Sequence, residues 1–337
     1  MRKSILLPLL VVGCSGDAEG AGYRAVPDFV DRSVPVACES VDLGPMAVDA
    51  LRVVTDSTVL VLDAAARRIT ELGDDLRPRR TLEYVEHGPG AVARPVAATL
   101  LGDTVAIIAR DGLRLVLLTR AGDVLHEEPL EFVPNAIAAA GDELLITPMP
   151  LGAVPASLLF RFRHGTLDEI PVPRRPYADM MVGAMGNSTL VEGLADGSAL
   201  VVHQLLRPRA FHVSADRTLV TPLTVPTPDG TIALAEAVPR APITEEQFDR
   251  LLVPAMAMSV DRMRGEIFLL TRSGRTVDGR RERAILRTDD RLGYAASYLL
   301  DVNAVHLAVL PRRSAALVVD DADRFFLCPI DGGAVAE

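Results

Sequence analysis

Six histidines are the residues best suited to acid–base or metal chemistry in this sequence. They are His87, His126, His164, His203, His212 and His306. No HxH or HExxH spacing occurs among them, and such compact spacings are what place imidazoles on one zinc ion. His203 and His212 could face each other across a hairpin, but two imidazoles alone make an incomplete zinc site. Local spacing therefore predicts neither a metal site nor catalytic residues.

The densest group of carboxylates contains Asp320, Asp321 and Asp323. Calcium takes roughly six to eight oxygen ligands, so such a group could contribute to a calcium site. The pattern D-x-x-x-R, however, occurs at both Asp63…Arg67 and Asp320…Arg324, each time in the link between two strand-like runs. A turn carboxylate that binds the arginine across a hairpin explains both copies. We therefore expect a structural role and predict no cofactor, calcium being the one considered.

Nucleophilic serine chemistry and phosphate binding also have no supporting motif. There is no G-x-S-x-G sequence, and Ser188, Ser198 and Ser259 have no partnership with histidine and aspartate that the sequence reveals. The GPG sequence at 88–90 precedes a proline-led strand, whereas a phosphate cradle precedes a helix N-terminus. Any chemistry must then come from residues that the fold brings together.

One fold unit recurs along the chain. Thr55–Leu76 contains an apolar strand, a tight link carrying Asp63, a second strand and a polar turn. The pattern returns at Arg312–Gly333, and a looser copy occupies Gly102–Asp123. A small sheet cannot bury both of its faces unless neighbouring sheets cover them, so a repeated strand pair indicates a β-propeller.

The turn that precedes each long, apolar inner strand marks one blade. The six candidate turns are Asp56-Ser57, Gly102-Asp103, Gly141-Asp142, Asp196-Gly197, Arg264-Gly265 and Arg312-Arg313. The strands that follow them are rich in Val, Ile and Leu, as expected of strands covered on both faces. The sequence thus predicts an all-β, six-bladed propeller over 31–333.

Two of the intervals between these turns exceed the about 40–50 residues of a four-stranded blade and should hold insertions. One contains a predicted helix at about 243–252, where Thr244 and Gln247 fit a capping box. The other contains Arg174–Ser188, with methionines at 180, 181 and 185. This Met-rich segment could fill a core, form an adaptable contact site, or hide a seventh blade.

Two stretches resemble the bacterial six-bladed β-propeller lipoproteins of NHL/TolB-like architecture, which are largely uncharacterised. One stretch carries EHGPG at Glu86–Gly90 followed by RP at Arg94-Pro95, without the glycine usual earlier in that segment. The other is Val253–Gly274, where Phe268 stands in place of the frequent tryptophan. The resemblance spans nearly the whole mature chain and implies architecture rather than activity, because propellers host unrelated functions.

The N-terminus predicts export and lipid anchorage. Residues 1–13 combine Arg2 and Lys3 with an apolar stretch too short to span a bilayer, as in a signal peptide. The stretch ends in VVGC, which resembles a bacterial lipobox and predicts lipidation of Cys14; an ordinary secretory signal is the alternative. Residues 14–30 should form a flexible tether. Ser15 favours the outer membrane, so we expect a protein of the bacterial envelope.

Export leaves Cys38 and Cys328 as candidates for a disulfide, because the exported compartment is oxidising. A propeller ring is often closed by an N-terminal strand joining the last blade. The strand Val34–Leu43 would then lie beside Asp323–Ile330 and bring the two cysteines together. The alternative is two separate buried thiols.

Charge and the absence of a catalytic motif favour a binding role. The net charge of −10 argues against a nucleic-acid partner, whose phosphates need a basic surface. We expect a non-catalytic binding or scaffold module, held on a membrane by its lipid, for a protein, peptide or glycan. The alternative is a metal-dependent hydrolase, lactonase or lyase at the central channel, where single residues from several blades would meet. Its candidate residues are Asp49, His203, Asp261 and His306.

Overall fold

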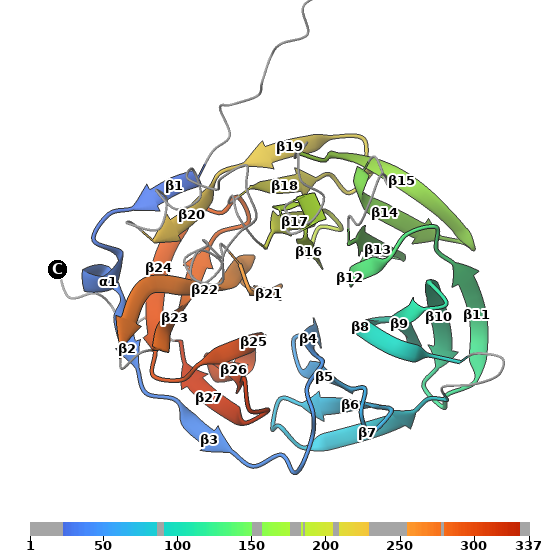
Figure 1. Ribbon diagram of the computed structural model, residues 1–337, viewed down its shortest axis with the longest axis horizontal. Helices are drawn as coiled ribbons and strands as arrows, with labels where there is room; N and C mark the ends of the chain where they lie inside the picture. The colour runs from blue at the N-terminus through green and yellow to red at the C-terminus, as the bar shows by residue number, and fades with distance from the viewer. Residues whose placement is uncertain are drawn as a thin grey trace, which may run out of the picture.

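Six antiparallel sheets surround a central axis in the computed structural model (Figure 1). The structure describes residues 23–85, 91–149, 157–175, 183–184, 186–204, 209–228, 255–277 and 280–330. Within these residues the sheets are the blades of a six-bladed β-propeller, as predicted. The Met-rich segment's three methionines and the helix predicted at 243–252 lie outside the described residues, as do the predicted signal peptide and Cys14.

The first three blades follow one another along the chain, each with its strands in sequence order. Blade 1 contains β4 (Ala50–Thr55), β5 (Thr58–Asp63), β6 (Arg68–Gly73) and β7 (Pro78–Glu83). Blade 2 contains β8 (Ala93–Leu101), β9 (Thr104–Asp111), β10 (Arg114–Thr119) and β11 (Val124–Pro129). Blade 3 contains β12 (Pro134–Ala140), β13 (Glu143–Pro148), β14 (Ser157–Arg163) and β15 (Thr166–Pro173).

The remaining blades complete the ring. Blade 4 contains β16 (Thr189–Gly193), β17 (Ala199–His203), β18 (Ala210–Val213) and β19 (Val220–Leu223). Blade 5 contains β21 (Ala257–Asp261), β22 (Glu266–Val277), β23 (Arg280–Thr288) and β24 (Tyr294–Leu300). Blade 6 contains β25 (Ala304–Leu310), β26 (Ala315–Asp320) and β27 (Phe325–Pro329), with the 3-10 turn Pro311–Arg313 between the first two strands.

The six turns predicted from the sequence are the turns between the first and second strands of the blades. The apolar runs that follow them are the second strands, however, and the innermost strands are those that precede each turn (Figure 1). The reason is burial. Second strands such as β13, β17 and β26 are buried along their whole length between adjacent blades, whereas β4 at the channel is only half-buried for most of its length.

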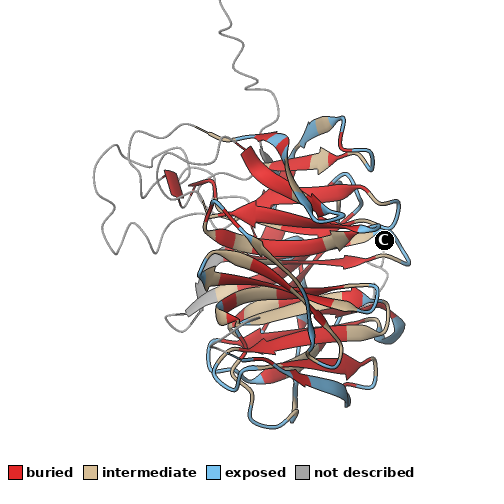
Figure 2. Ribbon diagram, turned by 90° about the vertical axis from the view of Figure 1, so that its right-hand side faces the viewer, coloured by how far each residue is buried: buried red, intermediate tan, exposed pale blue. Residues whose placement is uncertain are grey.

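The hydrophobic core lies between the blades, as the buried residues in Figure 2 show. Each interface between neighbouring blades holds its own cluster of buried side chains. Leu60 and Leu62 of blade 1, for example, share a cluster with Ile107 of blade 2. Phe268 is 2 % exposed between blades 5 and 6. Burial of this apolar surface provides the main driving force for ring assembly.

An N-terminal strand closes the ring, as predicted. β3 (Glu39–Val41) pairs antiparallel with β27 and supplies the fourth strand of blade 6. The expected single strand Val34–Leu43 is divided, however, because β2 (Val34–Val36) pairs parallel with β24 of blade 5 before the chain crosses to blade 6. The predicted disulfide is present, and it joins Cys38 to Cys328 with their Cα atoms 4.3 Å apart.

The segment before β2 binds the ring more extensively than the tether predicted over 14–30. β1 (Tyr23–Val26) pairs parallel with β20 (Val225–Pro228) outside the blades. The short helix α1 (Phe29–Arg32) follows, and Phe29 is completely buried in the cluster between blades 4 and 5. The expectation of a tether up to residue 30 is therefore wrong for residues 23–30, because Val26 and Phe29 bury apolar side chains. We call residues 23–38 the N-terminal arm.

Among the described residues, no helix has the length and apolar character that crossing a membrane requires.

Candidate functional site

An ion pair between opposite blades crosses the centre of the ring. Arg52 extends from β4 of blade 1, and its Nη1 lies 3.1 Å from Oε2 of Glu192 in β16 of blade 4. Nη2 of Arg52 also donates to the Val191 carbonyl at 3.1 Å. Both side chains are largely shielded from solvent. This pair, which no local sequence pattern reveals, fills the central channel.

A second arginine reinforces this constriction. Arg262 follows β21 of blade 5, and its Nη1 donates to the Val54 carbonyl of blade 1 at 2.7 Å. Its Nε donates to the Gly193 carbonyl of blade 4 at 3.4 Å. Burial raises the pKa of Glu192, while the charges of Arg52 and Arg262 oppose that rise. Side chains from three blades therefore close the channel toward the end at which the inner strands finish.

Close approach of the inner strands accompanies this closure. A Cβ atom at Gly193 would lie 2.1 Å from the backbone oxygen of Ala139 in β12. Only glycine can occupy that position without displacing the backbone of blade 3.

Asp261, one of the four channel candidates, has a structural role. It ends β21 and is 1 % exposed. Its Oδ1 accepts hydrogen bonds from the backbone N–H groups of Met263 at 3.0 Å and Arg264 at 3.1 Å. These contacts stabilise the turn between the first two strands of blade 5. Asp261 lies at the end of the ring where the inner strands finish.

Asp49 and His306 lie together at the other end of the ring, where the inner strands begin. Burial lowers the pKa of His306, opposed by a hydrogen bond to the Val48 backbone and by the charges of Asp323 and Asp49. Oδ2 of Asp49 accepts the Ala64 N–H at 2.7 Å. The structure thus brings two of the four channel candidates together, while Asp261 lies at the opposite end.

His203 is a buried histidine on a second strand. It ends β17 and is 1 % exposed, and its Nδ1 lies 2.8 Å from the Gly186 carbonyl. Burial lowers the pKa of His203 to about 4, against the opposing effect of that hydrogen bond. The imidazole is therefore neutral at pH 7, with Nδ1–H donating to Gly186, and Nε2 has no hydrogen-bond partner among the residues that the structure describes. His203 is separate from the pair formed by Asp49 and His306.

The buried His203 should make the protein less stable in acid. Above pH 6.5 the imidazole is neutral in both the folded and the unfolded chain, so it adds no pH dependence. Between pH 6.5 and about 4 only the unfolded chain takes up the proton, and stability should fall by about 3 kcal/mol. The measurement is urea unfolding from pH 7.5 to 4 for the wild type and for His203→Gln, which can still donate to Gly186.

The wild-type curve minus the His203→Gln curve isolates this group, because His306 contributes in the same direction to both. If the unfolding free energies of the wild type and of His203→Gln changed equally with pH, this result would contradict a neutral, buried His203.

His212 contacts a serine that the sequence left without a partner. Its Nε2 lies 3.0 Å from Oγ of Ser198, and that hydroxyl donates to Oδ1 of Asp196 at 2.5 Å. The order of contacts places serine between histidine and aspartate, whereas nucleophilic catalysis places histidine between the other two. Ser198 is also 1 % exposed. The group stabilises the turn that precedes β17.

The structural interpretation of the D-x-x-x-R pattern is confirmed at one copy and corrected at the other. Asp320 accepts a hydrogen bond from Nε of Arg324 at 2.8 Å. Burial alone would raise the pKa of Asp320, but the hydrogen bonds from Arg324 and from the Ala322 backbone outweigh burial and lower the pKa. Asp63 instead pairs with Arg68, at 3.1 Å, rather than with Arg67. The reason is that Arg67 occupies the left-handed turn position, with φ 55°, so the next residue carries the cross-strand contact.

A recess of about 260 Å³ lies beside Asp49, between blades 1 and 2. We call it the face recess; it is lined by Asp49, Ala64, Arg94, Pro95, Val96 and Arg110. Arg94 and Arg110 extend from β8 and β9 of blade 2, while Asp49 and Ala64 flank β4 and β5 of blade 1. The sequence analysis identified Asp49 but neither arginine, because the two blades meet only in the folded ring.

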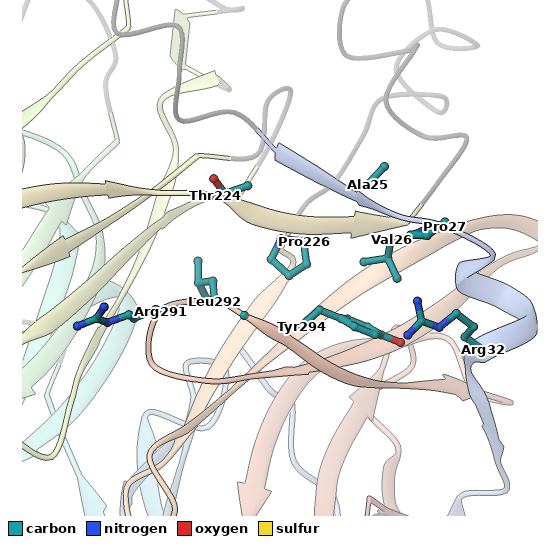
Figure 3. Close-up of a pocket in the computed structure, with 10 residues that line it drawn as sticks. Ala25, Val26, Pro27, Arg32, Thr224, Pro226, Arg291, Leu292 and Tyr294 are labelled. Atoms are coloured by element: carbon teal, nitrogen blue, oxygen red, sulfur yellow. The ribbon is translucent and has the colours of Figure 1, made fainter. Parts of the chain in front are cut away.

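A larger recess, of about 430 Å³, lies under the N-terminal arm (Figure 3). Val26 and Arg32 of the arm form one wall, and Leu292 and Tyr294 of blade 5 form the other. The Arg32 guanidinium lies 5.4 Å from the centre of the Tyr294 ring, which holds the arm against the blade. This recess lies outside the ring of inner strands.

Among the described residues, no group of three or more His, Cys, Asp or Glu side chains is placed to hold a metal ion.

No protein-family model and no curated protein matches this chain. Solved structures share its fold. A member of the DUF4221 family from Bacteroides vulgatus is 8 % identical with a TM-score of 0.61, and the match covers 88 % of this chain and 98 % of that one. An exported protein from Bacteroides fragilis is 11 % identical with a TM-score of 0.55, covering 91 % of this chain and 97 % of the other.

Virginiamycin B lyase from Staphylococcus aureus is 13 % identical with a TM-score of 0.50, and the match covers 89 % of this chain and 96 % of the lyase. At these identities the three likenesses support the propeller fold, in agreement with the sequence resemblance, and do not extend to activity.

Proposed function

We propose that this protein is an envelope lipoprotein whose propeller acts as a non-catalytic binding or scaffold module for a protein partner. The observation that carries the proposal is the closed channel, where Arg52, Glu192 and Arg262 occupy the space in which blades could pool catalytic groups. Contact with a partner then falls to the two faces and the rim of the ring. Peptide and glycan partners would use the same surfaces.

The N-terminal arm supports the anchoring part of the proposal. Only eight residues separate Cys14 from Tyr23, where β1 begins. Lipid on Cys14 would therefore hold the ring close to the membrane, in our proposal the outer membrane that Ser15 favours, through a short link. The disulfide between Cys38 and Cys328 is in keeping with an oxidising compartment.

Photo-crosslinking in cells tests anchorage and partner binding together. A photoreactive residue is placed at Arg94 near the face recess, at Met263 on the opposite face, or at Leu125 on the rim, all exposed side chains. We expect one surface to give a discrete adduct in the membrane fraction while the other two serve as matched controls. Cys14→Ala should move the protein out of that fraction and reduce the adduct several-fold.

The metal-dependent hydrolase or lyase is the competing function. It would be favoured by a lack of adducts from all three surfaces together with about one calcium, zinc or manganese per purified chain. Retention of the Cys14→Ala variant in the membrane fraction would contradict the lipid anchor but not the binding role.

A further inference from the structure

The guanidinium of Arg110 has no partner in the described structure. The side chain is half-buried, and its Nε is shielded from solvent without a hydrogen bond. Other arginines at blade interfaces are paired: Arg120 binds Glu71 at 2.8 Å, and Arg217 binds Glu143. A guanidinium without a carboxylate partner gains charge-assisted hydrogen bonds when an anion binds the part of it that solvent can reach.

Asp49 brings a negative charge to the same recess. One carboxylate oxygen, Oδ2, accepts the Ala64 N–H, while Oδ1 makes no hydrogen bond within the described residues. A ligand that carried only negative charge would be repelled by Asp49. A ligand with a carboxylate and an ammonium group would satisfy both Arg110 and Asp49.

Size and the remaining walls narrow the ligand further. The volume of about 260 Å³ falls below the roughly 300–1,000 Å³ of pockets for drug-sized ligands, so the recess suits a smaller molecule. Pro95, Val96 and Ala64 provide an apolar wall. Arg94 lies at the exposed rim, 3.5 Å from Asp111, and that carboxylate offsets its charge.

We propose that the face recess binds a small aliphatic α-amino acid as its zwitterion, with the carboxylate on Arg110, the ammonium on Asp49 and the side chain against Pro95 and Val96. This binding site goes beyond the scaffold role and does not depend on it.

Calorimetric titration of the mature protein with three probes tests the ligand class. The probes are L-alanine, propionate, which lacks the ammonium, and ethylamine, which lacks the carboxylate. We expect saturable binding of alanine and weaker binding of the other two. Arg110→Met should weaken alanine binding about tenfold or more, because it removes a charge-assisted hydrogen bond. Arg80→Met, at an exposed arginine of β7, is the matched control and should change nothing.

Removing the charge of Asp49 makes the test specific, because the two probes should respond differently. Asp49→Asn should weaken alanine binding but leave propionate binding equal or tighter, because the repulsive charge is gone. Thermal unfolding of each variant checks that the ring remains folded.

Three outcomes would overturn the proposal: no saturable alanine binding, equal alanine affinity in Arg110→Met and Arg80→Met, or tighter binding of propionate than of alanine to the wild type. None of these affects crosslinks from Leu125 or Met263, so failure here is distinguishable from failure of the scaffold role.

Discussion

Replacing Glu192 by leucine is expected to destabilise the protein by about 3–5 kcal/mol. The substitution leaves the guanidinium of Arg52 largely shielded from water and without its carboxylate partner. An unpaired buried charge costs far more than the net stabilisation that an intact pair provides. Chemical denaturation of wild type and Glu192→Leu measures the difference in the free energy of unfolding.

The double variant Arg52→Met/Glu192→Leu separates charge from packing. It should recover most of the loss, because neither side chain then brings a charge into the channel. Asp142→Leu is the surface control. Its pair with Arg163, at 2.8 Å, is largely exposed to solvent, so its loss should have little effect on stability. A loss below about 1 kcal/mol for Glu192→Leu would contradict a tightly closed channel.

Loss of the disulfide between Cys38 and Cys328 is expected to destabilise the protein by about 5 kcal/mol. The bond closes a loop with a sequence separation of 290 residues. In the chain-entropy model, cross-linking restricts the unfolded state more strongly as the loop lengthens. Guanidinium unfolding of the mature protein with and without a thiol reductant measures the effect.

The Cys38→Ala/Cys328→Ala variant provides the control for the reductant. It should unfold at the midpoint of the reduced wild type and should not respond to reductant. A midpoint that is the same for the oxidised and the reduced protein would show that β3 and the arm close the ring without covalent help.

Sequence patterns predicted the architecture well because the second strand of each blade has a recognisable apolar sequence. A strand covered by a blade on each side must be apolar at nearly every position, as β13 and β26 are, so its run and the preceding turn can be counted. The pairing of Cys38 with Cys328 could be predicted once a closed ring of blades was assumed. The innermost strands could not be recognised as innermost from the sequence. One face of β4 meets the polar channel, so polar and apolar residues are mixed along this strand.

The sites were far less predictable. Arg52 and Glu192 are 140 residues apart and sit on opposite blades, so only the closed ring makes them partners. Arg110 and Asp49 likewise meet only where two blades adjoin. The sequence predicts a tether for residues 23–30 because a strand such as β1 is short, and its parallel pairing with β20 leaves no periodic pattern in the sequence.

The arm and the disulfide also determine how a pulling force would pass through the molecule. If Cys14 carries the proposed lipid, tension applied at that end would first load the hydrogen bonds between β1 and β20, then α1, then β2. At Cys38 the load would pass into a covalent bond to Cys328 and bypass the chain between them. Residues 23–37 could be stretched to a total length of about 50 Å at most, whereas the loop of 290 residues, roughly 1,000 Å when fully extended, would not be pulled out. In the proposed anchored form, the disulfide would therefore limit how far a moving membrane could separate the anchor from the ring.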